Sequence, residues 1–441
     1  MTKLYKIVLT AYIRATNSIA FLPTLITLVF FNFSLTLLFF DRLGFDALIK
    51  QNIPSMIAHN ADSARSILGT LGAGIISLTV FSFSMVMIVI NQASSSFSPR
   101  VIPGLLSKKS HQLVLGVYVG TIVYTTVLLG YFGNSNDHSA LLGIAVVFSI
   151  LFSIACLILF IYFIHSISKS IQVDNITKNI FTITLRQIEK NKNNVETYPG
   201  YSKPDTSKWF VLAGASEGYL QNINYSPLVA LAKDNDIVID ILIPKGEFLL
   251  KNYPLCKINK DVSDDKSIKN ALLDCFITYP GEYIEEHYIY GFKQISEIAA
   301  KALSPGINDP GTALHAIDLL TMLYLAQMEI HEAGYLFDDH GRLRVIKNLI
   351  SFDELLYRYL SPIRIYGKAD VIVLARLLEC LNKLLYADIH GEHTDHLIAY
   401  LRVIIEDARE TITNNVDRKK INKLIEKING LIDKNELLYY I

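Results

Sequence analysis

A histidine-rich segment, DIHGEHTDH at residues 388–396, carries the side chains best suited to bind a metal ion. Imidazole and carboxylate groups are both ordinary ligands of zinc. On a helix, the three-residue spacing of the imidazoles would point them in different directions, whereas a loop around Gly391 would let them converge. The candidate ligands are His390, His393 and His396. A metal site is therefore one interpretation, and a solvated loop before the next helix is the simpler one.

A second candidate is SPGINDPGTALH, residues 304–315, which combines two prolines, two glycines and an Asn-Asp pair. Pro305 and Gly306 are expected to end one helix, because neither residue continues a helix well. Asp309 is then placed to cap the next helix, with Pro310 at its first position. This structural interpretation explains four of the residues without any ligand.

The same segment also offers polar groups that a helix boundary does not require. Thr312 and the N–H groups of a helix start are suited to an anion, although Asp309 already places a carboxylate at this positive end. The preceding helix would supply two lysines if the fold brings them near. A ligand or a subunit contact is the alternative to a purely structural loop. The candidate contact residues are Lys293, Lys301, Asn308, Asp309, Thr312 and His315.

Polar residues also recur every seven positions in the apolar segment ILGTLGAGIISLTVFSFSMVMIVINQ. This polar stripe consists of Thr70, Ser77, Ser84 and Asn91. The spacing places the four near one line along a helix, with slow drift. Polar groups that face lipid are costly, so the stripe is expected to face protein or water. Close helix packing through small residues and the lining of a pore in a homo-oligomer are both open, and neither excludes the other.

The polar stripe belongs to one of four long apolar runs in the first part of the chain. The runs cover approximately residues 19–40, 67–90, 113–132 and 140–164. None contains Asp, Glu, Lys or Arg, and each is close to the roughly 20 residues that cross a bilayer core. The whole chain is 51% hydrophobic with a mean hydropathy of +0.33, more apolar than most soluble proteins. We predict a transmembrane domain of four helices over residues 1–170.

The distribution of basic residues predicts the orientation of these four runs. The loop YFGNSNDHSA between the third and fourth runs carries no Lys or Arg, and the first loop is mixed, with Arg42, Lys50 and Arg65 beside three aspartates. We predict that both termini and everything after Ile164 are cytoplasmic. The basic residues on that side are Lys3, Lys6, Arg14, Arg100, Lys108, Lys109, Lys169, Lys178, Arg186, Lys190 and Lys192.

The region from 171 to 206 is expected to contain a juxtamembrane helix and a linker. Ile164, Ile167 and Ile171 share one helical face, but the next isoleucines share another, about half a turn away. One straight amphipathic helix would not change sides in this way. A break near residues 172–174, with Asp174 as the cap of a new helix, accounts for the change.

The remaining chain is predicted to be a cytoplasmic α+β region. Residues 207–260 contain five short strand-like segments and one short helix, typical of a small β-barrel or sandwich. Residues 261–441 are mainly helical, with a hairpin that turns at Asp338–Gly341. The helices are expected at 266–278, 289–303, 312–331, 369–388, 395–413 and 416–436.

Composition excludes several classes of protein. There are 41 Lys+Arg and 41 Asp+Glu residues, so no basic excess indicates binding to nucleic acid. The four cysteines form no CxxC pair, which argues against a disulfide framework or a zinc ribbon. Phosphate-binding, zinc-protease, hydrolase and dinucleotide motifs are absent from the sequence. We therefore expect neither an enzyme nor a cofactor.

Three sequence blocks, FSFSMVMIVINQASSSFSPR, YFIHSISKSIQVD and ALSPGINDPGTA, occur in this order along the chain. The chain thereby resembles a bacterial family of predicted inner-membrane proteins, domain of unknown function 2254. The resemblance covers nearly the whole chain and implies an integral membrane protein with a cytoplasmic carboxyl-terminal half. It supplies no reaction and no ligand. Lys293 stands where the family pattern has arginine, and a lysine is only a point charge for a carboxylate or phosphate.

Two functional hypotheses follow. The first is a homo-oligomeric channel or transport-like protein of the bacterial inner membrane, in which the polar stripe borders the path and the cytoplasmic half assembles or gates it. The second is a membrane-anchored sensor or scaffold that binds a small ligand, an ion or a partner through its cytoplasmic half and does not conduct. They differ in whether water reaches the polar stripe.

Overall fold

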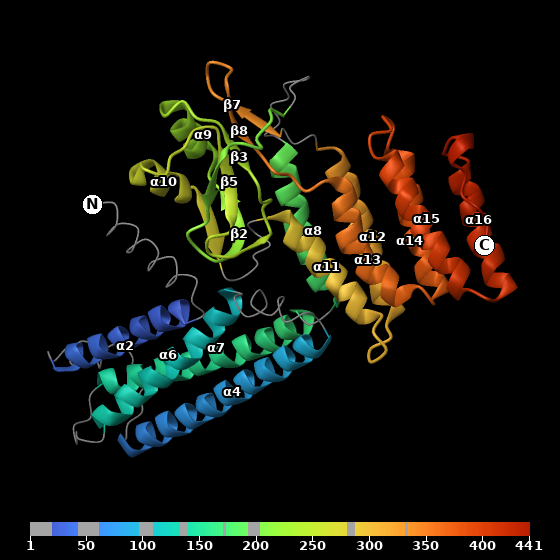
Figure 1. Ribbon diagram of the computed structural model, residues 1–441. Helices are drawn as coiled ribbons and strands as arrows, with labels where there is room; N and C mark the ends of the chain where they lie inside the picture. Colours follow the sequence, from blue (N-terminus) through green and yellow to red (C-terminus); the bar gives the residue numbers. More distant parts are fainter. Residues whose placement is uncertain are drawn as a thin grey trace. The chain divides into compact units, whose positions relative to one another are not determined.

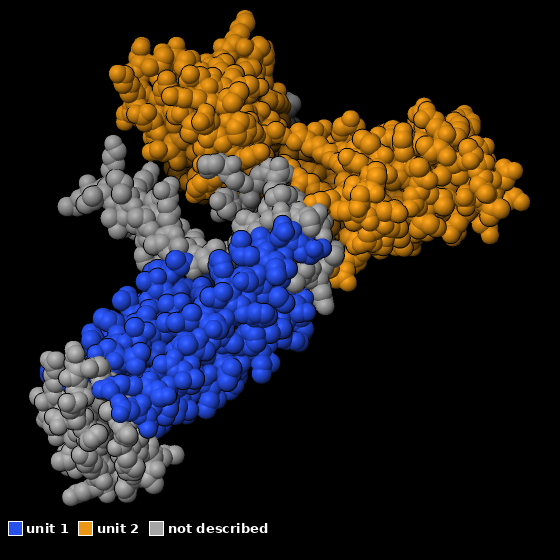
Figure 2. Space-filling model, turned by 90° about the horizontal axis from the view of Figure 1, so that it is seen from below, with its two compact units in different colours: residues 1–95, 101–172 blue, residues 96–100, 173–441 orange. Residues whose placement is uncertain are grey.

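The computed structural model describes residues 20–42, 61–96, 109–132, 140–170, 173–192, 203–279, 287–330 and 334–441. The chain forms two compact units, which Figure 2 shows in separate colours. The first unit contains residues 1–95 and 101–172, and the second contains residues 96–100 and 173–441.

Within the part of the chain that the structure describes, the first unit contains four helices (Figure 1). They are α2 Phe21–Arg42, α4 Ala61–Ser96, α6 Lys109–Phe132 and α7 Ala140–Ser170. All four are long and apolar enough to cross a membrane, which confirms the four predicted apolar helices. The 36 residues of α4 correspond to a length of about 54 Å, well beyond a hydrocarbon core of about 30 Å. The intervening loops, whose basic residues determine the predicted orientation, lie outside the described residues.

Helices α2 and α6 pack closely because α6 carries glycine at two positions one turn apart. A Cβ atom on Gly116 would lie 2.8 Å from Cδ1 of Ile26 and 3.0 Å from Cα of Pro23. A Cβ atom on Gly120 would lie 2.9 Å from the ring of Phe30. The pair forms a GxxxG motif, which lets two helix backbones approach in a membrane. The sequence analysis did not identify this motif.

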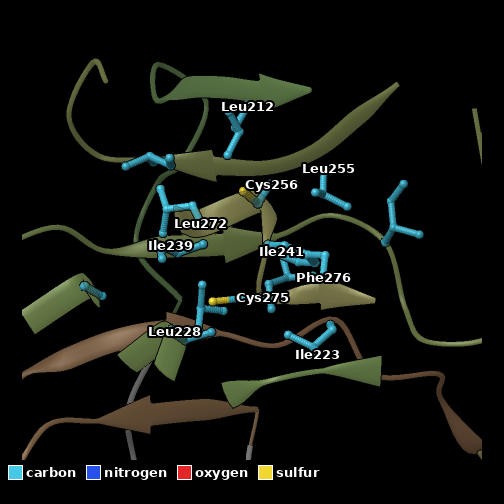
Figure 3. Packing of buried hydrophobic residues seen from close by; sticks show 14 of the residues in the cluster. Leu212, Ile223, Leu228, Ile239, Ile241, Leu255, Cys256, Leu272, Cys275 and Phe276 are labelled. Atoms are coloured by element: carbon cyan, nitrogen blue, oxygen red, sulfur yellow. The ribbon is translucent and has the colours of Figure 1, made fainter. Parts of the chain in front are cut away.

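The second unit begins with two small sheets that enclose one apolar core (Figure 3). The five-stranded sheet has the order β1-β5-β3-β8-β7, and the three-stranded sheet has the order β4-β2-β6. All neighbouring strands are antiparallel except β3 and β8. The strands are β1 Phe210–Ala213, β2 Gly218–Ile223, β3 Ile239–Ile241, β4 Phe248–Leu249, β5 Pro254–Ile258, β6 Phe276–Tyr279, β7 Tyr335–Phe337 and β8 Leu343–Ile346.

The five strands predicted between Trp209 and Ile258 are present, but of the two predicted alternatives, barrel or sandwich, the barrel is wrong. Strands β1 and β7 are the two edges of an open sheet and do not pair with each other. Three of the eight strands come from outside residues 207–260, and the predicted hairpin at Asp338–Gly341 supplies two of them. Helices α9 Tyr225–Asp234 and α10 Lys266–Leu273 contribute Leu228 and Leu272 to the core.

A buried ion pair within the β7–β8 hairpin organises its turn. The side chain of Asp338 accepts the backbone N–H of Arg342 and, at 2.8 Å, the Nε–H of Arg344. These interactions hold the pKa of Asp338 at about 2, well below its usual range. Arg344 also donates to Asp236 at 3.1 Å, which ties β8 to the turn before β3.

The rest of the second unit is a series of helices that begins at the sheets and ends at α16 (Figure 1). Helix α13 was not predicted, because Pro362 lies inside it and resembles a helix break in sequence. The predicted helix 266–278 is too long, since its last part is strand β6. The helices are α8 Val173–Lys192, α11 Tyr288–Ala302, α12 Pro310–Met328, α13 Phe352–Gly367, α14 Val371–Ala387, α15 Thr394–Thr411 and α16 Asn415–Asn429.

Helix α8, the first helix after the fourth apolar span, packs against α11 and α12. Its buried residues Ile176, Ile180 and Ile188 lie on the face that makes this contact. At the closest point a Cβ atom on Gly291 of α11 would lie only 1.7 Å from Oγ1 of Thr184. Glycine is therefore required at 291 for the two helices to meet, and α8 is a part of the fold of the second unit.

We expect Gly116→Val to separate α2 from α6, because the new side chain would collide with the Pro23 backbone. Overpacking of this kind costs about 1–3 kcal/mol, which a lower Tm in detergent would report. Gly130→Val on the same helix is the matched control, since a Cβ atom there meets nothing within 4 Å. Equal losses in the two variants would contradict the proposed contact.

We expect Gly291→Ala to release α8 from α11, even though alanine is the better helix former. Hydrogen exchange of the full-length protein should show faster exchange of the α8 amides at residues 173–192. Gly306→Ala is the control, because its Cβ atom meets nothing within 4 Å. Unchanged protection of α8 in Gly291→Ala would refute the close contact with Thr184.

Candidate functional site

The polar stripe of α4 faces away from the other three helices of its own unit. Its members Thr70, Ser77, Ser84 and Asn91 are all exposed. The residues of α4 that pack inside the unit include Leu68, Ile75 and Ser82, again at seven-residue spacing. This buried row is offset by two positions from the stripe, a rotation of about 200°. Packing among the described helices of this unit therefore does not account for the stripe.

The hydroxyl groups of the stripe hydrogen-bond to their own helix. Thr70 donates to the Ser66 carbonyl at 2.8 Å, Ser77 to the Ala73 carbonyl at 3.0 Å and Ser84 to the Val80 carbonyl at 2.9 Å. A hydroxyl group has one donor and two acceptor lone pairs. Because each hydroxyl donor is used inside the helix, Thr70, Ser77 and Ser84 present acceptor oxygens to their surroundings, whereas the amide of Asn91 carries both donors and an acceptor.

The stripe extends over a distance that matches a bilayer. Thr70 and Asn91 are 21 residues apart, about 31 Å along a helix, close to the thickness of a hydrocarbon core. Helix α2 also exposes Thr24, Asn32 and Thr36, but these extend over only 12 residues, about 18 Å along the helix. Helix α7 exposes aliphatic residues and Tyr162 between residues 143 and 164. Among the described helices, α4 thus has the longest exposed polar line.

Two large apolar side chains lie within the stripe. Phe81 and Ile88 follow Ser77 and Ser84 by one turn, and they are 55% and 64% exposed. The Phe81 ring also contacts Phe160 of α7, with 5.8 Å between the ring centroids. The stripe therefore alternates acceptor oxygens with apolar groups, an arrangement known from pores that restrict water at apolar rings.

The loop between α11 and α12 has the geometry of a helix boundary. Asp309 caps α12 by accepting the backbone N–H of Thr312 at 3.1 Å and its hydroxyl at 2.6 Å, and Pro310 begins the helix. Asn308 has a φ of 51°, in the left-handed region, which asparagine tolerates better than most residues. The backbone N–H of Asp309 donates to the Ala302 carbonyl at 2.8 Å and closes the loop.

The other polar candidates near this loop are not all brought together. Lys293 lies near the start of α11, with its Nζ atom 5.9 Å from the ring centroid of Tyr219 on β2. Lys301 lies eight residues further along α11, about 12 Å along the axis and next to the loop. His315 is exposed on α12. Lys293 therefore belongs to the sheet side of α11 and not to the loop.

The three histidines of the 388–396 segment do not converge. Asp388 organises this loop by accepting the backbone N–H of Glu392 and of His393, at 3.1 and 2.9 Å. The ring of His393 packs on Phe352, with 4.4 Å between centroids, while His390 and His396 are exposed. No group of three or more potential ligands suited to a metal ion occurs among the residues that the structure describes.

The start of α11 contains a histidine that the sequence analysis did not single out. His287 is the N-cap residue, and its Nδ1 atom accepts the backbone N–H of Ile289 at 3.4 Å. Its ring stacks on Tyr288 with 4.6 Å between centroids. Burial, with a smaller contribution from the charge of Lys245, lowers the pKa of His287 to about 3. A neutral imidazole thus caps the start of α11, and Gly291 lies one turn further along the same helix.

The four long apolar helices agree with the comparison to known proteins. The family description "Predicted membrane protein (DUF2254)" matches residues 16–383. This match covers most of the chain, and the chain belongs to that family of predicted membrane proteins.

Its curated relatives are themselves uncharacterised. An uncharacterised protein of Mycobacterium bovis is 25% identical over 376 residues, which cover 81% of this chain and 70% of the relative. An uncharacterised protein of Mycobacterium tuberculosis matches with the same identity and coverage. No solved structure matches the chain.

We expect the stability of the second unit to fall as the pH drops from about 6.5 to about 3. In this range the unfolded chain protonates His287 and the folded chain does not, so the unfolded state gains up to about 1.4 kcal/mol per pH unit. His287→Phe should lack this part of the slope. Fluorescence of Trp209, the one tryptophan of the chain, reports unfolding in denaturant. Identical slopes for the two proteins would contradict the buried neutral imidazole.

Proposed function

We propose that this protein is a homo-oligomeric membrane channel, in which α4 helices from several copies surround a conducting path. The observation that carries the proposal is the outward direction of the polar stripe over about the thickness of a bilayer core. A polar line that its own chain does not cover is accommodated by neighbouring copies and water. The proposed role is transport and not catalysis.

The chemistry of the stripe favours cations over anions. The described stripe contains no charged side chain, and its hydroxyl hydrogens are used within α4. The outward oxygens therefore act as acceptors, which replace part of the hydration of a monovalent cation. An anion would require outward donors, which the three hydroxyl positions do not supply and which within the stripe only the Asn91 amide carries. We propose selectivity for K⁺ or Na⁺ over Cl⁻.

The same face of α4 leaves room for a neighbouring helix. Ala73 and Gly74 are exposed beside Thr70 and Ser77, and a Cβ atom added to Gly74 would meet nothing within 4 Å. Small residues of this kind let helices of different copies approach closely. This feature supports assembly of several copies around α4.

The cytoplasmic unit is the proposed gating or assembly element. Helix α7 ends at Ser170 and α8 begins at Val173, so the fourth span is followed almost directly by a helix that packs on α11 and α12. The loop of residues 304–315 joins those two helices. A ligand or partner that changed the α11–α12 arrangement would act on α8 through the contact at Gly291.

The proposed location is the bacterial inner membrane, with both termini in the cytoplasm. The support is the excess of basic residues on one side of the four apolar runs in the sequence. The family match and the mycobacterial relatives agree with a bacterial membrane protein.

A non-conducting membrane scaffold is the second candidate, and one specific observation favours it. The stripe hydroxyls already donate to carbonyls of their own helix, which lowers the cost of placing them against lipid. In that case α4 would tolerate a lipid-facing stripe, and the function would reside in the cytoplasmic half.

We expect purified protein in liposomes to conduct K⁺ more readily than Cl⁻. Ser77→Leu combined with Ser84→Leu should reduce the cation flux at least tenfold, because leucine removes the acceptor oxygens and fills the path. The matched control is Ile76→Leu with Phe83→Leu, two exposed α4 positions about a quarter turn or more from the stripe. Its flux should equal that of the wild type.

The outcomes separate the two candidates. Loss of flux in the stripe variant alone places the path along α4. No flux through the wild type in K⁺ or Na⁺ over a range of pH values, with correct insertion, would reject the channel and favour the scaffold. Equal loss in both variants would indicate damage to the helix bundle and contradict the path along the stripe.

A further inference from the structure

The last residues of the chain lie between α15 and α16. After α16 the chain forms the 3-10 turn Lys434–Glu436, and residues 437–441, here called the tail, run back along α16. Neither the channel nor the scaffold proposal uses this segment. It also lies outside the part of the chain that matches the family description.

Two asparagines of α16 bind the tail through its backbone alone. Asn429 donates to the Leu438 carbonyl at 3.0 Å and accepts the Leu438 N–H at 2.8 Å. Asn422 does the same with Ile441, at 3.1 and 2.9 Å. Each amide side chain thus pairs with both polar groups of one residue, as a neighbouring β-strand would.

The spacing of the two asparagines fits an extended peptide. Seven helical residues separate Asn422 from Asn429, a rise of about 10.5 Å. Three residues separate Leu438 from Ile441, and three residues of extended chain cover about 10 Å. The spacing of Asn422 and Asn429 on α16 therefore matches the spacing of every third residue in an extended strand.

Helix α15 supplies the other side of the site. Arg409 Nη2 lies 3.3 Å from the Tyr440 carbonyl, so a third side chain also binds backbone. The one tail side chain that is deeply buried is Leu438, which is 3% exposed. We define the tail site as Arg409, Asn422 and Asn429 together with the position that Leu438 occupies.

In its own chain the tail leaves much of its apolar surface uncovered. Leu437, Tyr439 and Tyr440 are 44%, 81% and 56% exposed. The connector before it is also largely exposed, and Leu431 within it is 45% exposed. A segment held by backbone bonds and a single apolar anchor, on an exposed connector, has the features of an exchangeable element.

We propose that the tail site is a receptor for an extended peptide, and that its occupant in the assembled protein is the tail of a second copy. The same hydrogen bonds form whether the tail comes from its own chain or from a neighbour, so the balance depends on effective concentration. The proposal rests on the proposed assembly only for that local concentration. The exposed Leu437, Tyr439 and Tyr440 are the surface that a neighbouring copy would then cover.

The test uses full-length protein in liposomes and two exposed positions that face each other across the site. One population carries Arg409→Cys and a second carries Tyr440→Cys, with different affinity tags, and the four native cysteines are all buried. After the two are mixed and reconstituted, a short bis-maleimide is added. Exchange of tails predicts a covalent pair that carries both tags. The double variant in one chain tests whether the linker reaches.

A variant without the two asparagines distinguishes cross-links that form through the tail site from cross-links that form by random collision. Asn422→Ala with Asn429→Ala should reduce the two-tag product at least fivefold. Lys423→Ala, an exposed neighbour on α16, should leave it unchanged. A double variant that cross-links only within its own chain, with no two-tag product from the mixture, would overturn exchange. Absence of any cross-link in the double variant would overturn the tail site itself.

A parallel cross-link distinguishes this proposal from the channel. Thr70→Cys on the polar stripe reports assembly through α4 in the same liposomes. Cross-links at Thr70→Cys without a two-tag tail product reject tail exchange and leave the assembly standing. Two-tag tail products without cross-links at Thr70→Cys support tail exchange and reject an assembly centred on α4.

Discussion

A polar group inside a membrane must find its hydrogen bond within the protein, and α4 meets this requirement within itself. The hydroxyls of Thr70, Ser77 and Ser84 donate to carbonyls of the preceding turn. The helix therefore does not need its own bundle to cover them, and the buried face of α4 is free to be apolar. The direction of the stripe, and with it every functional argument about the membrane half, follows from this local satisfaction of the hydroxyl groups.

The membrane half was predictable from the sequence in its elements but not in its packing. Runs of about 20 apolar residues without charges have few alternatives to a membrane helix, so all four helices were found. The contact of α2 with α6 was not, although Gly116 and Gly120 are plain in the sequence. The two glycines form a contact site only because Ile26 and Phe30 of α2 lie opposite them. Sequence periodicity does not tell which helix lies opposite a given face. The stripe has the same limitation, since its spacing fixes a line on α4 but not its direction.

In the second unit, local sequence patterns predicted single elements but not how these elements pair. Short β-branched segments and turn residues located the first five strands, and capping chemistry located the start of α12 at Asp309. The closed barrel was wrong because the fold completes its sheets with strands from distant parts of the chain, and the pairing of β3 with β8 joins residues about 100 positions apart. The grouping of Lys293 with the loop was misleading for a related reason. Lys293 and Lys301 are eight positions apart on α11 and lie on similar sides of the helix. Because they are about 12 Å apart along its axis, Lys293 lies next to Tyr219 of β2 and Lys301 lies next to the loop.

The extent of the family match divides the candidate features into two kinds. The polar stripe, the α8 contact at Gly291 and the loop around Asp309 all lie within residues 16–383. A function common to the family has to be built from features in this part, which is why the channel proposal uses the stripe and the α8–α11 contact. Helices α15 and α16 and the tail lie beyond the residues that the family description matches. If the matched part forms the path, the tail site is suited to control how copies associate around it, because Arg409, Asn422 and Asn429 bind only backbone groups and would bind the tail of another copy equally well.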